Sequence, residues 1–148
     1  MAAVIAISGC TQQGNNTTVQ NNTTVQQNTT NTSAKVDVTA NQTGPATAKK
    51  GSDVTITYTV LNNGNEPVFN VKINSQDFQQ TIGTLQPGET RTFNNKMHIP
   101  TDQEVQQDFG ANATVSNPLY IGGFSVSFSD AGGAKHSILS NSISISLS

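Results

Sequence analysis

VTITYTVLNNGNEPVFNVKI, residues 54–73, alternates apolar and polar side chains on both sides of a turn-forming segment. From Val54 to Val60 every second residue is apolar, and the residues between them are threonines. After the turn, Phe69, Val71 and Ile73 repeat the alternation. A period of two is typical of β-strands that bury one face. We therefore predict a hairpin at 54–73, with which the rest of the chain pairs or packs.

More strands are predicted on both sides of this hairpin. Apolar residues also alternate, or nearly so, at 35–40, 82–85, 89–99, 124–128 and 143–147. Gly44-Pro45, Pro87-Gly88 and Asp130–Gly133 separate these segments with residues that preset or tolerate turn conformations. About seven strands separated by turn signals predict an all-β fold, a β-sandwich.

One short helix is predicted directly after Pro100. Thr101-Asp102-Gln103-Glu104 fits a capping box. In this motif the threonine oxygen accepts a hydrogen bond from a backbone amide in the first turn, and the glutamate accepts one from the threonine amide. The helix should make about two turns and end near Phe109-Gly110.

The first ten residues differ sharply from the tract that follows them. Residues 1–10, MAAVIAISGC, are apolar or small up to Cys10, whereas the next residues are polar. One interpretation is a short buried strand at the start of the chain. The other, which we favour, is a truncated export signal, because Ile7-Ser8-Gly9-Cys10 resembles the lipobox of prokaryotic lipoproteins. This resemblance implies export and a lipid on Cys10 that holds the protein at the membrane.

Residues 11–34 form a polar tract of low complexity. NNTTVQ occurs at 15–20 and again at 21–26. A segment with so few large apolar side chains cannot offset the entropy lost on ordering, so we expect a disordered tether. As a flexible coil the tether would span about 25–30 Å. It would hold the folded domain, residues 35–148, away from the membrane.

The triplet Asn-X-Ser/Thr, the acceptor sequence for N-linked glycans, occurs repeatedly along the chain. A tract rich in Asn and Thr produces such triplets by composition alone. Modification also requires a glycosylation system on the export side of the membrane. Both interpretations stay open for the candidate glycosylation sites Asn15, Asn16, Asn21, Asn22, Asn28, Asn31, Asn41 and Asn112.

Two segments resemble a family of prokaryotic surface proteins. Residues 58–67, YTVLNNGNEP, followed by Asn70-Val71, resemble the YTVTNTGNxPLxNVxV signature of surface repeats of the cell-adhesion-related (CARDB-like) type. Residues 82–90, IGTLQPGET, resemble that family's IGTLxPGET segment. The resemblance implies an immunoglobulin-like antiparallel β-sandwich used in cell-envelope and adhesion proteins, often archaeal, and it carries over no catalytic residue. This chain differs in having one copy and an inserted segment, residues 100–123.

The composition argues against two kinds of site. A net charge of −2, with 11% charged residues and scattered basic ones, does not suit nucleic acid, which requires a dense basic patch. Cys10 is the only cysteine. Neither an intrachain disulfide nor a thiolate cluster for zinc can therefore form.

We also predict no metal, cofactor or catalytic site. His98, beside Met97, and His136 are the only histidines, and the alternation places His98 on the solvent face rather than in a metal site. No Ser-His-Asp arrangement or glycine-rich phosphate loop is evident. A helix cap and the lack of a ligand loop pattern argue against calcium at the nearby acids Asp102, Glu104 and Asp108.

Two functional hypotheses follow. The first is an exported, lipid-anchored structural or interaction protein of the cell surface, with other envelope proteins or glycans as partners. The alternative is a module that binds envelope carbohydrate, because sugar sites combine planar polar groups with exposed aromatic rings. Tyr120, in NPLYIGG at 117–123, is the candidate ligand contact. A competing interpretation, which the sequence favours, makes Tyr120 a hydrophobic plug that closes one end of the sandwich.

Overall fold

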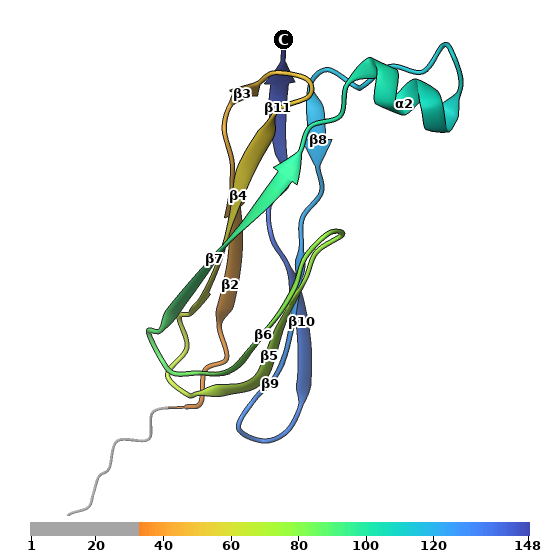
Figure 1. Ribbon diagram of the computed structural model, residues 1–148. Helices are drawn as coiled ribbons and strands as arrows, with labels where there is room; N and C mark the ends of the chain where they lie inside the picture. The colour runs from red at the N-terminus through yellow and green to blue at the C-terminus, as the bar shows by residue number, and fades with distance from the viewer. Residues whose placement is uncertain (1–32) are drawn as a thin grey trace, which may run out of the picture. The chain divides into compact units, whose positions relative to one another are not determined.

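The computed structural model describes residues 33–148, which form a β-sandwich with one short helix (Figure 1). The predicted signal and almost all of the predicted tether lie outside the described residues. The helix is α2 (Asp102–Phe109). The strands are β2 (Val38–Thr43), β3 (Thr47–Ala48), β4 (Asp53–Asn62), β5 (Val68–Asn74), β6 (Gln79–Leu85), β7 (Thr90–His98), β8 (Leu119–Ile121), β9 (Ser125–Ser129), β10 (Lys135–Leu139) and β11 (Ile143–Leu147).

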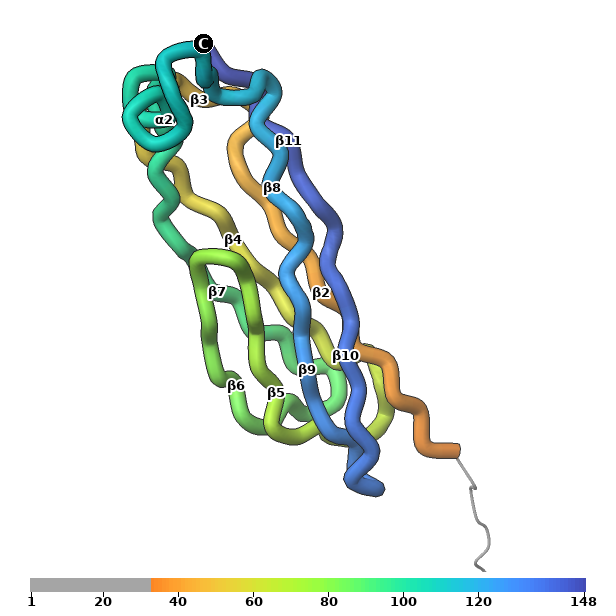
Figure 2. Tube along the Cα trace, turned by 90° about the vertical axis from the view of Figure 1, so that its right-hand side faces the viewer, coloured from red at the N-terminus to blue at the C-terminus, as the bar shows by residue number. Residues whose placement is uncertain are grey.

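The strand order is that of an immunoglobulin-like sandwich. One sheet has the order β2-β4-β7 and the other has the order β10-β9-β5-β6. These correspond to strands A-B-E and G-F-C-C′ of immunoglobulin-like domains. A smaller sheet, β3-β11-β8, extends the second sheet towards the helix (Figure 2). All pairs are antiparallel except β3 with β11, which are parallel. The predicted fold class is therefore confirmed.

The predicted hairpin at 54–73 is wrong, although both of its strands exist. β4 pairs with β2 and β7, whereas β5 pairs with β6 and β9. The turn between them carries the chain from one sheet to the other. Asn62 fixes this crossover, because its buried side chain donates to the carbonyl oxygens of Glu66 (2.8 Å) and Leu85 (3.0 Å) and accepts from the Gly64 amide (2.9 Å).

The start of the first strand differs from the prediction. It begins at Val38 rather than near Lys35, and Val36 is 38% exposed. The strand ends at Thr43, directly before Gly44-Pro45, as predicted. The sequence analysis also missed β10, because only His136 and Ile138 of that strand face inward and the apolar alternation is weak.

Two extended segments near the C-terminus, 119–129 and 135–147, are each interrupted, and the two interruptions lie side by side. β8 and β9 are separated by residues 122–124, and β10 and β11 by residues 140–142. A Cβ atom on Gly123 would lie 2.5 Å from the Ser140 carbonyl oxygen, so only glycine fits there. The Ser140 amide bonds the Phe124 carbonyl oxygen at 2.9 Å, which holds the two interrupted strands together.

Gln42 of β2 joins this interruption to the first sheet. Its side chain is buried and donates to the carbonyl oxygens of Gly122 and Asn141, both at 2.8 Å. The Asn141 side-chain amide in turn accepts a hydrogen bond from the Gln42 backbone N–H and donates one to the Gln42 backbone carbonyl oxygen. These bonds pair the two backbones where no strand ladder does, and they fix the position of Gly122.

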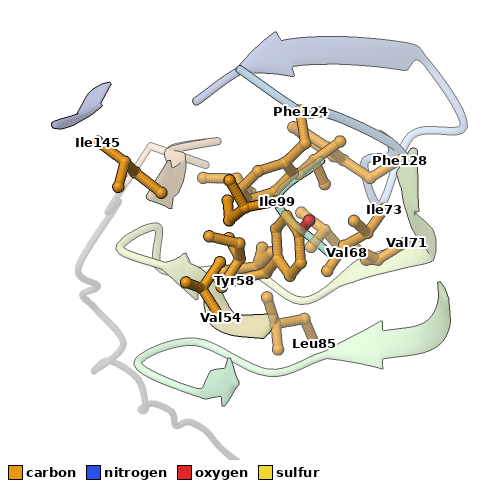
Figure 3. Packing of buried hydrophobic residues seen from close by; sticks show 14 of the residues in the cluster. Val54, Tyr58, Val68, Val71, Ile73, Leu85, Ile99, Phe124, Phe128 and Ile145 are labelled. Carbon is orange, nitrogen blue, oxygen red and sulfur yellow. The ribbon is translucent and has the colours of Figure 1, made fainter. Parts of the chain in front are cut away.

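The core lies between the two sheets (Figure 3). Tyr58 stands near its centre, with Phe78 stacked at 4.9 Å and Phe124 edge-on at 5.1 Å between ring centroids. Offset and edge-on contacts are the geometries that aromatic pairs prefer. The buried apolar residues are Val38, Val54, Ile56, Tyr58, Val60, Val68, Val71, Ile73, Leu85, Ile99, Val115, Phe124, Val126, Phe128, Ile145 and Leu147.

The register predicted for the long strand near residue 93 is confirmed, but burial there is incomplete. On β7, Phe93 and Met97 face the core and Thr92 faces solvent. Phe93 is only partly buried because β7 is the last strand of its sheet. Its removal should therefore cost less than removal of a fully buried phenylalanine.

The predicted helix and its capping box are confirmed. The Thr101 hydroxyl accepts from the Glu104 amide at 3.2 Å, and Glu104 accepts from the Thr101 amide at 2.9 Å. None of the eight helical residues is fully buried. Asp102 secures the helix to the sandwich by pairing with the Lys50 ammonium at 2.8 Å and accepting from the Val115 amide at 2.8 Å.

Candidate ligand-binding groove

A groove of about 260 Å³ opens between the two sheets beside β8. We call it the Tyr120 groove. Its lining combines apolar, aromatic, amide, acidic and glycine residues, among them Tyr58, Asp77, Asn95, Met97, Tyr120 and Gly122. They come from β4, the β5–β6 turn, β7, β8 and the segment after β8.

The groove exists because one strand pair stops short. β5 follows β9 only as far as Asn74, opposite Ser125, and then turns back into β6 (Figure 2). Beyond that point β8 pairs with β11 alone among the described strands. β7 is likewise the last strand of its sheet. The groove therefore lies between two strands that each have one unpaired edge.

The floor of the groove is apolar and firmly held. Tyr58 is buried, and its hydroxyl lies 3.4 Å from the Ser75 hydroxyl at the β5–β6 turn. Leu119, Ile121 and Met97 are partly buried and pack against the core.

Tyr120 is 72% exposed at the rim of the groove. It lies between Leu119 and Ile121 on β8, so its side chain points to the opposite face of the strand. The interpretation of Tyr120 as a plug is therefore wrong, because a plug would be buried. Its role as a ligand contact stays a prediction.

Polar side chains line the opposite rim. Among residues 33–148, the side chains of Gln76, Asp77 and Asn95 have no hydrogen-bond or ion-pair partner, and Gln76 and Asp77 are exposed. Asn95 faces inward from β7 and is half-buried. The groove thus offers two amides and a carboxylate to a ligand, without first breaking an internal bond.

A histidine held between two carboxylates stands at the end of the groove. His98 Nδ1 lies 3.0 Å from Asp53 Oδ1, and Nε2 lies 3.2 Å from Glu104 Oε1. The hydrogen bond with Asp53, and then that with Glu104, raises the pKa of His98 above its ordinary value of 6.5. The same contact with His98 lowers the pKa of Asp53. The cluster links β4, β7 and the first turn of α2.

The sign of these shifts predicts how stability depends on pH. Protonated His98 donates to both carboxylates, so its contribution is complete below pH 6.5 and is lost as the pH rises through its raised pKa. The carboxylates contribute in full above their ordinary pKa values of 3.8 and 4.5, and this contribution is lost as the pH falls through their lowered pKa values. We expect a higher urea midpoint at about pH 5.5 than at about pH 8. In His98→Gln this difference should shrink, and an unchanged difference would show that the cluster does not contribute.

Three of the other residues considered for metal binding are engaged elsewhere. Asp102 pairs with Lys50, and Glu104 caps the helix and bonds His98. His136 of β10 bonds Asp130, in the β9–β10 turn, at 2.8 Å. No group of three metal-ligating side chains comes together within residues 33–148.

Two candidate glycosylation sites fall in the described domain, and both are exposed. Asn41 lies in β2, and Asn112 lies in the turn after α2. The other six acceptor sites and Cys10 lie outside the described residues. Among the described residues, no helix is long and apolar enough to cross a membrane.

The sequence analysis found only part of this site. Tyr120 stood out as an aromatic residue outside the alternating strands. Asp77 and Gln76 gave no signal because they are isolated polar residues in a short turn. Gly122 was hidden within a glycine pair, although Gly123 alone is required by close packing.

Comparisons with known proteins do not identify the chain. No model of a known protein family matches it, and no curated protein does so either.

Proposed function

We propose that this chain is an exported lipoprotein whose β-sandwich acts as a binding domain at the cell surface, held to the membrane by a lipid on Cys10. The observation that carries the proposal is the position of the groove within the described domain. The domain begins at the end where Asp37 and Lys35 bond the β4–β5 turn. β8, which contributes Leu119–Ile121 to the lining of the Tyr120 groove, lies in the other half of the domain, as does α2 (Figure 1). A domain attached by its N-terminus would present this half outward.

The resemblance to CARDB-like surface repeats supports the same role. Residues that carry the resemblance have structural roles in this fold. Asn62 fixes the crossover between the sheets, and Gly88 takes a positive φ of 78° in the β6–β7 turn. The domain would act by binding rather than by catalysis and without a cofactor, and its partners would be envelope proteins or glycans.

Replacement of Cys10 tests the anchor. Each buried methylene of a lipid contributes about 0.8 kcal/mol, and two chains suffice for stable attachment. Cys10→Ser should therefore move the protein from the membrane fraction to the soluble extracytoplasmic fraction. Cell fractionation followed by immunoblotting measures this change.

Ser8→Ala is the matched control, because it changes a hydroxyl in the same segment and keeps the thiol. It should leave the protein in the membrane fraction. Cys10→Ser protein that stays with the membrane would contradict the lipid anchor.

Carbohydrate binding is a second candidate function, favoured by one specific observation. Tyr120 presents an exposed ring at the rim of a groove whose amides and carboxylate have no partner within residues 33–148. We also propose that Asn41 and Asn112 carry glycans if the host has the required system, since both are exposed.

A further inference from the structure

We propose that the Tyr120 groove binds uncharged sugar residues of an envelope glycan. Asp77 and Asn95 bond the hydroxyls of a sugar in the groove, and Tyr120, on the outer face of β8, stacks on a neighbouring sugar that extends past the unpaired edge of that strand. The proposal deepens the carbohydrate alternative and rests on the proposed surface location for the source of the glycan.

The charges of the groove select against anionic ligands. Asp77 is an exposed carboxylate at the rim, and no Lys or Arg lines the groove. His98 is the nearest cationic candidate, but Asp53 and Glu104 occupy both of its ring nitrogens. A phosphate, sulfate or uronic acid would meet an unpaired negative charge without a free cation. A hydroxyl-rich neutral ligand would instead supply the donors that a carboxylate accepts.

The polar groups also provide the acceptors and donors that a sugar requires. A carboxylate accepts two hydrogen bonds in one plane, and an amide both donates and accepts. Adjacent hydroxyls on a pyranose ring present such pairs of groups. Because Asp77 and Asn95 have no partner among the described residues, binding would cost no internal hydrogen bond.

Gly122 places no side chain in the groove wall, and the fold does not require a glycine at this position. Its φ is not in the left-handed region, and a Cβ atom built there meets no other atom within 4 Å. Neighbouring Gly123, in contrast, is required by its contact with Ser140. The fold would tolerate a side chain at Gly122, so its absence is explained by close approach of a ligand to the backbone.

Tyr120 supplies the stacking surface. Its ring is exposed on the outer face of β8 because both of its strand neighbours pack inward, and its hydroxyl has no partner among the described residues. Aromatic faces attract the C–H groups on the flat side of a sugar ring, and a phenol hydroxyl adds a polar contact at the edge.

An extended peptide pairing with β8 is the rival occupant, and the structure favours it less. β8 has only three residues, so the ladder that a peptide could form there is short. Peptide pairing would use the backbone and would leave the Tyr120 ring and Asp77 carboxylate without a role.

An oligosaccharide array tests the proposal with the full chain, produced without export so that Cys10 carries no lipid. The array carries neutral oligosaccharides of glucose, mannose and N-acetylglucosamine, together with sulfated and uronic-acid oligosaccharides. A peptide of alternating valine and serine serves as the strand-pairing probe. We expect binding to at least one neutral oligosaccharide and none to the anionic ones or to the peptide.

Matched variants locate the binding. Tyr120→Ala and Asp77→Ala should each weaken binding on the order of tenfold or more. Phe109→Ala and Asp108→Ala should not, because those residues are equally exposed but lie outside the groove. Equal urea midpoints would show that all four variants stay folded.

Three results would overturn the proposal: no neutral sugar bound, binding that survives both groove substitutions, or capture of the peptide instead. Because the assay uses protein without a lipid, these results are independent of the Cys10→Ser fractionation. Loss of sugar binding with an intact anchor would refute the groove assignment alone. Sugar binding by a protein that is never anchored would refute the proposed location alone.

Discussion

Phe124→Ala should lower the free energy of unfolding by about 3–5 kcal/mol. Phe124 is 1% exposed and packs edge-on against Tyr58 at the centre of the core. Its loss removes the transfer energy of the ring and leaves a cavity between the two sheets. A small domain has a total stability of about 5–15 kcal/mol, so this one change removes a large fraction of it.

Phe109→Ala is the control for this substitution. The residue is 80% exposed at the end of α2, and its removal should change stability by less than about 0.5 kcal/mol. Phe93→Ala should fall between the two, since Phe93 is partly buried on an edge strand. Urea unfolding of the three variants measures the order, and equal losses for Phe109 and Phe124 would contradict the described core.

Asn62→Ala should lower the free energy of unfolding by about 2–4 kcal/mol. The buried amide makes three hydrogen bonds at the crossover between the sheets. Without it, the carbonyl oxygen of buried Leu85 and the amide of Gly64 lose a partner where water has little access. An unsatisfied buried polar group costs more than the net value of the bond it has lost.

Asn63→Ala is the neighbouring control. Asn63 is exposed, and its side chain makes one long hydrogen bond, 3.2 Å to the Thr39 hydroxyl. Its removal should cost less than about 0.5 kcal/mol. If urea unfolding gave the two asparagine variants the same stability, the role assigned to Asn62 in fixing the crossover would be wrong.

The central stretch shows what alternation can and cannot predict. The pattern at 54–73 identified both strands and the buried face of β4, because burial of one face requires a period of two. On β5 it correctly placed Val71 and Ile73 inward, but the inward placement of Phe69 was wrong. Val68 is buried in its place because the register shifts between Val68 and Val71. The pattern did not reveal that the strands belong to different sheets. Alternation reports which face is buried, and the choice of partner depends on the turn. Here that choice is made by the buried side chain of Asn62.

Local signals predicted local structure well. The capping box at Thr101 and the turns at Gly88 and Gly133 were recognised because each depends on a few adjacent residues. β10 was missed because its inward side chains include His136, which is polar and stacks on Phe128 at 5.1 Å. The conformation of β10 depends on its pairing with β9, and the apolar pattern of one segment does not show with which strand it pairs.

The groove could not be predicted as a whole. It depends on where β5 stops and on the interruption between β8 and β9, and both are set by contacts between distant segments. Tyr120 was recognised as a candidate, but its exposure follows from its face on a three-residue strand. Asp77 comes into the site only because the β5–β6 turn ends beside β8.

The mass of the N-terminal peptide of the protein, purified from the membranes of cells that export it, tests the central claim most directly. The account predicts a mature chain that begins at Cys10, with a lipid mass added to that residue and residues 1–9 removed. Proteolysis followed by mass spectrometry of the Cys10 peptide would show both changes together. A chain that retains residues 1–9 and an unmodified Cys10 thiol would contradict the proposed surface lipoprotein.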